Sequence, residues 1–172
     1  MKNKTKCGVV TLTGFPNAGK STLINSITKN KISIVSHKVQ TTRENIKGII
    51  NFGTSQLVFI DTPGIISVRK HFNKTLARSI TENQNFCDIN LFIFDVNKKI
   101  KKLNTNLIKQ LLSICDNNIL VLNKIDLINR PELLNIAKSL NQKLQFKSTF
   151  MISAKKNEGV EVLLKEILSL IP

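Results

Sequence analysis

The segment Gly14-Phe15-Pro16-Asn17-Ala18-Gly19-Lys20-Ser21 fits the pattern GxxxxGK[ST], which constrains this chain more than any other feature. In such a loop, glycines let backbone N–H groups turn toward phosphate oxygens, and the helix that follows presents its positive N-terminus to the same anion. The strand-like run Cys7–Thr13 precedes the loop and a helical pattern follows it. Because a chance glycine turn lacks these flanking elements, the segment predicts a phosphate-binding loop. In it, Lys20 would neutralise phosphates and the Ser21 hydroxyl would ligate Mg²⁺.

Short apolar runs alternate with helical patterns along the chain, which predicts a doubly wound α/β sheet with helices on both faces. The predicted strands are Cys7–Thr13, Gly48–Phe52, Gln56–Asp61, Asn90–Val96, Asn118–Asn123 and Ser148–Ser153. Five helices are predicted. The first follows Lys20, the second covers about His71–Phe86, and the third has apolar residues from Leu107 to Cys115 on one face. The fourth starts at Pro131, and the fifth runs from Val160 to Ile171. The second and third strands are too close for a crossover helix and form a hairpin. A length of 172 residues fits a single domain over residues 1–172.

A second motif, Asp61–Gly64 (Asp-Thr-Pro-Gly), closes the apolar run Leu57–Ile60. Alone it is an ordinary β-turn. At the carboxyl end of a strand in an α/β sheet, however, it lies where such sheets bind ligands. There Asp61 can hold a water on Mg²⁺, and the Gly64 N–H can meet the terminal phosphate of a nucleotide.

Two further motifs concern the base. Asn123–Asp126 (Asn-Lys-Ile-Asp) closes another apolar strand, and Ser153–Lys155 (Ser-Ala-Lys) ends the last one. Asp126 can accept hydrogen bonds from N1–H and the exocyclic amine of guanine, whereas adenine offers neither donor at that edge. Lys124 can lie over the ring, and the Ala154 N–H can meet guanine O6. These motifs predict a guanine nucleotide.

All four motifs, each at a strand end, form the signature of a translation-factor-like GTPase. Between the phosphate loop and the hairpin, the segment Lys31–Gly48 contains Gln-Thr-Thr-Arg at 40–43 and Ile-Lys-Gly at 46–48. From about Val9 to Ile171 the chain therefore resembles the Era family, bacterial GTPases of small ribosomal subunit assembly. The resemblance implies a TRAFAC-class P-loop domain. Its six-stranded, mostly parallel sheet would have only the strand before Gln56 antiparallel.

The resemblance also assigns roles to individual residues. It implies that Thr42, with Thr41 as the alternative, ligates Mg²⁺ in the GTP state together with Ser21 and, through water, Asp61. It allows Asn17 to hold K⁺ beside the phosphates, although Asn17 is equally explained as a turn residue. Lys20, Thr42 and Gly64 are the predicted catalytic residues. The predicted GTP-binding residues are Gly14, Phe15, Pro16, Asn17, Ala18, Gly19, Lys20, Ser21, Thr22, Asp61, Thr62, Pro63, Gly64, Asn123, Lys124, Asp126, Ser153, Ala154 and Lys155.

Two departures shape the expected function. Small signalling GTPases place a water-orienting glutamine directly after the second motif, where this chain has Ile65, so we expect slow intrinsic turnover. Era proteins continue into a KH-type RNA-binding domain with a GxxG loop. We find no such motif before Pro172, so the expected contact with the small ribosomal subunit or its rRNA is weakened.

The net charge of +15 has two interpretations. It fits a polyanionic partner such as RNA, with the lysine-rich run at 98–102 as a candidate contact. It also fits an AT-rich genome, because Lys, Asn and Ile have AT-rich codons. No run approaches 18 apolar residues, and the three cysteines are scattered, so we expect a cytoplasmic protein without a transmembrane segment. We also expect a monomer. Peripheral membrane contact stays open.

The sequence therefore predicts a Mg²⁺-dependent GTPase that converts GTP to GDP and phosphate and acts in 30S assembly or 16S rRNA maturation. One alternative is a sister GTPase of the TrmE or Der type, acting in tRNA modification or ribosome biogenesis. The other is a nucleotide-gated binding module with little hydrolysis.

Overall fold

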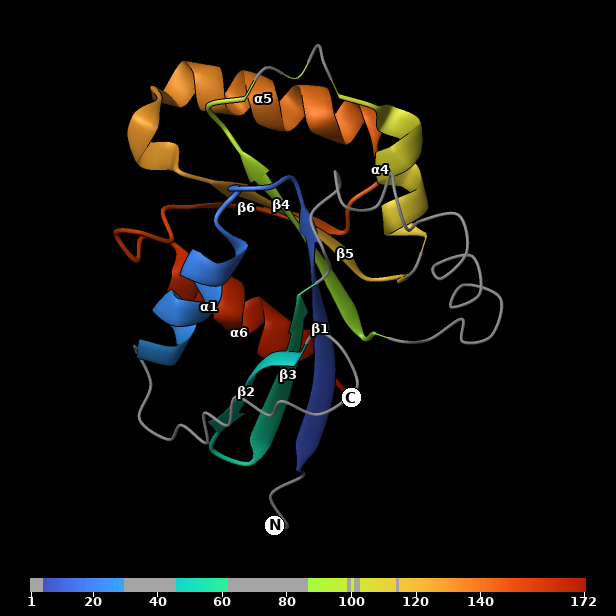
Figure 1. The fold of residues 1–172 in the computed structure, drawn as a ribbon, viewed down its shortest axis with the longest axis vertical. Helices are drawn as coiled ribbons and strands as arrows, with labels where there is room; N and C mark the ends of the chain where they lie inside the picture. Colours follow the sequence, from blue (N-terminus) through green and yellow to red (C-terminus); the bar gives the residue numbers. More distant parts are fainter. Residues whose placement is uncertain (1–4, 30–45, 62–86, 99, 101–102, 114) are drawn as a thin grey trace.

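Six strands form one sheet in the order β2-β3-β1-β4-β5-β6 (Figure 1). The computed structural model describes residues 5–29, 46–61, 87–98, 100, 103–113 and 115–172. The strands are β1 (Lys6–Gly14), β2 (Ile46–Phe52), β3 (Ser55–Asp61), β4 (Ile89–Asp95), β5 (Asn118–Asn123) and β6 (Ser148–Ile152). The helices are α1 (Lys20–Lys29), α4 (Thr105–Leu112), α5 (Arg130–Lys143) and α6 (Val160–Leu170), with a 3-10 turn at Ile125–Leu127.

The strand directions agree with the expected P-loop topology. β1 pairs in parallel with both β3 and β4, and β5 pairs in parallel with β4 and β6. β2 alone is antiparallel and joins β3 through the tight turn between Phe52 and Ser55. The predicted α/β fold with a six-stranded, mostly parallel sheet is confirmed. The carboxyl ends of β1, β3, β4, β5 and β6 consequently meet at one edge of the sheet, where the motifs begin.

Alternating side chains of the central strands fill two cores, one on each face of the sheet. Leu91 and Ile93 of β4 pack in the core that α1 and α6 cover, together with Ile27 and Leu163. Phe92 and Phe94, one step out of phase, face α4 and α5. Figure 1 shows α1 and α6 together on one side of the sheet, away from α4. Both faces are buried, which explains the nearly continuous apolar runs of β4 and β5.

A buried polar network connects the amino ends of β4 and β5. The Asn90 amide donates to Asn118 Oδ1 at 2.8 Å and accepts from the Thr13 hydroxyl at 2.8 Å. The Asn118 amide in turn donates to the carbonyls of Leu112 and Cys115, at 2.8 and 2.6 Å. All of these groups lie inside the protein, and each hydrogen bond compensates a polar atom removed from water.

Two boundaries differ from the expected ones. Cys115 was expected on the apolar face of a helix, but α4 ends at Leu112, because the Asn118 amide takes carbonyls at and beyond the helix end. Ile171 follows α6 rather than belonging to it, and is 2% exposed. The predicted helix at His71–Phe86 lies outside the described residues. Within the described ranges, no helix has the length and apolar character needed to cross a membrane.

Candidate nucleotide-binding site

The phosphate loop connects β1 to α1 through residues with left-handed backbone. Gly14, Asn17 and Gly19 have φ values of 140°, 61° and 99°. The Ala18 N–H donates to the Phe15 carbonyl at 3.2 Å and closes the turn. A side chain at Gly14 would collide with the backbone carbonyl of a β4 residue, so the loop can cross the sheet edge only with glycine there.

Lys20 is the first residue of α1, and its side chain folds back across the loop. Its ammonium donates to the Gly14 carbonyl at 3.5 Å and to the Phe15 carbonyl at 3.2 Å. Lys20 is 9% exposed, whereas Ser21 and Thr22 are exposed on the same helical turn. The first turn of α1 holds no acidic residue. This helix start therefore combines a fixed ammonium, free hydroxyls and the positive end of the helix dipole, which together suit an anion.

Phe15 and Lys98 attach the loop to the neighbouring β4 segment. The Phe15 ring packs edge-on against Phe92 and Phe94, with centroids 6.5 and 6.4 Å apart. The Lys98 ammonium donates to the Pro16 carbonyl at 3.2 Å and lies 5.8 Å from the Phe15 ring centroid. We expected Lys98 only as part of a basic surface run, since nothing in the sequence places it against the loop.

Asn123, at the end of β5, connects three of the four motifs. Its amide nitrogen donates to the Ala18 carbonyl of the phosphate loop at 2.8 Å. Its carbonyl oxygen accepts from the Ala154 N–H at 3.0 Å. Asn123 is 2% exposed, and the absence of a side chain at Gly19 leaves room for its amide. The predicted phosphate loop and the two predicted base motifs are thereby one connected assembly.

Lys124 adopts the left-handed conformation, with φ 69°, and pairs with an acid that sequence reasoning missed. Its ammonium lies 2.6 Å from Asp95 Oδ2, and the other oxygen of that carboxylate accepts from the Asn97 N–H at 3.0 Å. The Asp95 side chain is 8% exposed and the Lys124 side chain 33%. Asp95 is the last residue of the buried strand β4. An acid at the carboxyl end of an apolar run is the sequence feature that could have identified it as a site residue.

Asp126 is held as a carboxylate by its neighbours. A hydrogen bond from the Ser153 hydroxyl lowers the pKa of Asp126, and the nearby Lys156 and Lys155 ammonium groups lower it further. Ser153 is fully buried, and its hydroxyl also accepts from the Lys156 N–H at 3.2 Å. A charged acceptor at Asp126 suits a base edge that presents two N–H donors.

The other predicted residues are placed as follows. The Ala154 N–H, expected to meet guanine, donates in this structure to Asn123, and Lys155 is exposed. The backbone of Asp61 ends β3 opposite Leu12, but its side chain is outside the described part. The predicted residues Thr41, Thr42, Thr62, Pro63, Gly64 and Ile65 lie outside it altogether. Among the side chains that are described, no three His, Cys, Asp or Glu residues group as metal ligands.

Comparison with known proteins decides the family. A family model described as "50S ribosome-binding GTPase" matches residues 9–124. The chain belongs to the 50S ribosome-binding GTPase family. Within that family its likeness is to Era, and the resemblance seen in the sequence is confirmed. GTPase Era of Bradyrhizobium sp. (strain BTAi1) is 38% identical over 98% of this chain and 55% of its own length.

Solved structures of this GTPase family give the same result. A variant of Era from Aquifex aeolicus, bound to GDP·AlF4⁻, superposes with a TM-score of 0.66 and is 32% identical. An Era bound to MgGDPNP and nucleotides 1506–1542 of 16S ribosomal RNA gives a TM-score of 0.67, also at 32% identity. In each case the match covers 98% of this chain and 58% of the solved chain. The chain thus spans little more than half the length of these relatives.

Proposed function

We propose that this chain binds GTP and GDP through the four motifs and hydrolyses GTP to GDP and phosphate. The observation that supports this most is Asn123, which joins the phosphate loop to the base motifs through hydrogen bonds of 2.8 and 3.0 Å. A protein that reads only phosphates has no need to fix the base motifs against the loop. Residues 1–172 form one G domain in this proposal, acting as a cytoplasmic monomer.

Guanine is the base that suits the Asp126 carboxylate. N1–H and the exocyclic amine would donate to its two oxygens, the Lys124 stem would lie over the ring, and Asn123 would fix the loop beside it. Adenine would leave the carboxylate facing a lone pair, which disfavours it strongly. The Ala154 N–H would turn to guanine O6 only by sharing or releasing its bond with Asn123.

The residues at the start of α1 fit a magnesium-bound triphosphate. Ser21 offers an exposed hydroxyl oxygen, the kind of ligand Mg²⁺ prefers, directly after the buried ammonium of Lys20. Thr42 would supply a further oxygen and Asp61 would act through a water. When bound, Mg²⁺ neutralises negative charge on the β- and γ-phosphates. Lys20 would hold the same oxygens, and the Gly64 N–H would stabilise the γ-phosphate as it leaves.

Potassium is a separate part of the proposal. Asn17 is exposed, with φ 61°, so its side chain is available at the loop surface, although the same φ suits a simple turn residue. With K⁺ beside the phosphates, turnover should be severalfold faster in K⁺ than in Na⁺ at equal ionic strength. Asn17→Ala should remove the difference, and equal rates in the unsubstituted protein would refute the potassium site.

The deciding experiment measures base choice. The unsubstituted protein should bind GDP far more tightly than ADP. Asp126→Asn should lower the affinity for GDP and raise the affinity for xanthosine diphosphate, because the asparagine amide can donate to the C2 carbonyl of xanthine. Asp116→Asn, an exposed aspartate of another loop, is the matched control and should behave as the parent. Equal affinities for ADP and GDP in the parent would overturn the assignment. Single-turnover hydrolysis then separates a slow GTPase from a binding module that scarcely hydrolyses GTP.

The partner we propose is the small ribosomal subunit or its 16S rRNA. The support is the solved Era that holds 16S rRNA, together with the net charge of +15. Charge alone does not distinguish two nucleotide states, because a ligand that binds both states equally shifts nothing. Small subunits should therefore be retained better with a non-hydrolysable GTP analogue than with GDP at near-physiological salt. Equal, salt-labile retention would favour non-specific attraction, and retention of tRNA instead would favour the TrmE-type or Der-type alternative.

A further inference from the structure

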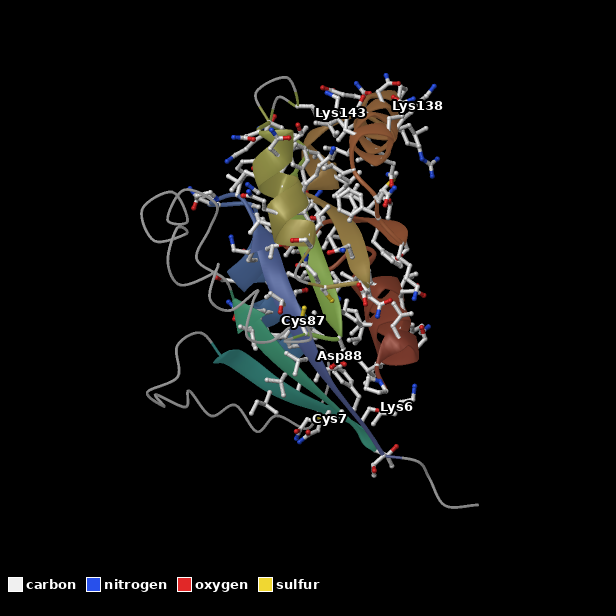
Figure 2. The ribbon with its side chains drawn as sticks, turned by 90° about the vertical axis from the view of Figure 1, so that its right-hand side faces the viewer. Lys6, Cys7, Cys87, Asp88, Lys138 and Lys143 are labelled. Carbon is white, nitrogen blue, oxygen red and sulfur yellow. The ribbon has the colours of Figure 1, made fainter. Side chains whose placement is uncertain are left out.

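Two of the three cysteines lie beside each other at the end of the sheet opposite the nucleotide site. Cys87 lies two residues before the start of β4, and Cys115 lies in the connection before β5. These strands are parallel neighbours with Asn90 opposite Asn118, and each cysteine lies the same number of residues upstream of its asparagine. Figure 2 shows Cys87 and Asp88 at the amino end of β4, away from Lys138 and Lys143 of α5.

Contacts between the pair and on its strand side hold the two segments together. The Cys115 thiol lies 3.2 Å from the Cys87 carbonyl oxygen. Next to it, the Asn117 amide donates to the Asp88 carbonyl at 2.9 Å, and the Asn90 N–H donates to the Asn117 carbonyl at 2.9 Å. Neighbouring strands lie about 4.8 Å apart, and a disulfide bridges Cα atoms separated by about 4.4–6.8 Å. The 3.2 Å approach of the Cys115 sulfur to the Cys87 backbone brings the two residues side by side, as an S–S bond requires.

The two thiols are also chemically unequal. A hydrogen bond between the two side chains lowers the pKa of Cys115 and raises the pKa of Cys87, which burial raises further. A backbone hydrogen bond at Asn117 also favours the Cys115 thiolate, whereas the carboxylates of Asp116 and Asp88 oppose it. The shared hydrogen bond thus lets one sulfur lose its proton while the other keeps it, and these directions favour Cys115 as the thiolate.

We propose that Cys87 and Cys115 form an oxidation site that hydrogen peroxide converts to a disulfide. In the first step, the Cys115 thiolate attacks a peroxide oxygen. The O–O bond breaks, the leaving oxygen takes a proton to become water, and Cys115 becomes a sulfenic acid. In the second step, the Cys87 sulfur attacks the sulfenic sulfur, the S–S bond forms, and the Cys87 proton leaves with the hydroxyl as water. Two thiols and one hydrogen peroxide thus give one disulfide and two waters.

This site is independent of the proposed nucleotide function. Its bond would tie the point where the chain enters β4, immediately after residues 62–86, to the connection that leads into β5. Asn123, which belongs to the nucleotide site, is the last residue of β5. The cross-link would lie before the first residue of β5, at the opposite end of the strand, and therefore outside the nucleotide site. Hydrogen peroxide is a small oxidant and suits a position where Cys115 is 6% exposed and Cys87 is half-buried.

The test is peptide mapping of the unsubstituted chain. The reduced protein is freed of reductant, treated with a small excess of hydrogen peroxide, unfolded with a thiol-blocking reagent present, and digested with trypsin. Peptides 79–98 and 110–124 should appear joined, lighter by two hydrogens than their sum. Titratable thiols should fall from three to one and return to three with dithiothreitol.

Cys7 provides the matched control. It is exposed near the start of β1, on the side of β3, and its sulfur lies 3.8 Å from Gln56 Oε1. Cys7→Ser should keep the joined peptides, whereas Cys87→Ser or Cys115→Ser should abolish them. The proposal is overturned if Cys7 enters the main cross-link. It is equally overturned if the two peptides stay separate while either sulfur proceeds to sulfinic acid. Both outcomes are read from the unsubstituted protein, so no variant has to fold.

Discussion

Asn123 uses both ends of its side-chain amide within the protein, and this makes the site sensitive to its replacement. Asn123→Ala would leave the Ala18 carbonyl and the Ala154 N–H without their partners in a buried setting. Losing two such bonds should destabilise the fold by about 2–4 kcal/mol, measured by urea unfolding. Affinity for GDP should fall by about tenfold or more, because the loop and the base motifs would no longer be fixed together.

Asn141→Ala is the control for that variant. Asn141 is exposed on α5, where its amide donates to the Ala137 carbonyl and to Thr149. Its removal should change the free energy of unfolding by no more than about 0.5 kcal/mol and leave GDP affinity unchanged. If both asparagine variants unfold at the same urea concentration, Asn123 does not have the connecting role described above.

Asp126 gives a pH-dependent prediction. Its pKa in the folded protein is lowered below the ordinary value of 3.8, chiefly by the Ser153 hydroxyl. A depressed folded pKa contributes stability that is present above the unfolded pKa and is lost as pH falls through the folded pKa. Ser153→Ala should therefore raise the Asp126 pKa toward 3.8, so that GDP binding fails at a higher pH than in the parent.

Carboxyl ¹³C chemical shifts, followed in a pH titration, measure this pKa directly. Ser169→Ala, which removes an exposed hydroxyl from α6, is the matched control and should leave the pKa of Asp126 unchanged. An unchanged Asp126 titration in Ser153→Ala would show that the neighbouring lysines, rather than the hydroxyl, hold the carboxylate.

The sequence names the candidate site residues, whereas the partners that hold them in place came only from the structure. Short motifs have fixed spacing, so Lys20, Asn123 and Asp126 could be named from the sequence. The Asp95–Lys124 ion pair joins residues far apart in the chain, and only the side-by-side placement of β4 and β5 brings them together. Nothing local indicated that Asn123 would take the Ala154 N–H that was expected to face the base.

Between elements, that ion pair fastens the end of β4 to the turn that follows β5. Asp95→Asn would leave the Lys124 charge unpaired, and Lys124→Met would leave a nearly buried carboxylate unpaired. Each change should cost about 1–3 kcal/mol in the free energy of unfolding and weaken GDP binding, whereas the double variant should recover part of both losses. A coupling energy of about 1 kcal/mol or more in a double-mutant cycle is the expected result.

The helix α6 offers a matched pair for this cycle. Lys165 and Glu161 lie one helical turn apart and are largely exposed, with Lys165 Nζ 3.3 Å from Glu161 Oε1. Their coupling should be only about 0.3–0.5 kcal/mol. Equal coupling in the two cycles would mean that the Asp95–Lys124 pair is as weak as a surface contact and does not position Lys124.

Element types followed from the pattern more reliably than element ends. Continuous apolar runs identified β4 and β5, and Pro131 in the first turn marked the start of α5. Cys115 continued the apolar spacing of α4, yet the helix stops at Leu112. The Asn118 amide of the following strand donates to the Leu112 and Cys115 carbonyls. The spacing of apolar residues does not indicate such a partner.

For the molecule as a whole, nucleotide binding and folding should be linked. The proposed site takes groups from the ends of β1, β4, β5 and β6, so the assembled pocket is absent from the unfolded chain. GDP with Mg²⁺ at about 100 times its dissociation constant should add about 2.7 kcal/mol to stability. For a chain of this size that corresponds to about 5–10 °C in the midpoint of thermal unfolding. ADP at the same concentration should give no shift, and equal shifts would contradict guanine selectivity.

The buried asparagines of β4 and β5 also bear on how the sheet avoids assembling wrongly. Strands that are apolar on both faces could slide past each other by two residues and still bury almost the same surface. Asn90 and Asn118 remove that ambiguity, since in a shifted alignment they would be stranded in hydrocarbon without Thr13 or the end of α4 to meet them. An uncompensated buried amide costs about 1–3 kcal/mol, a large fraction of the stability of a small domain. The two amides thus act as a proofreading device for strand alignment, one that a more hydrophobic and nominally better-packed interior would lack.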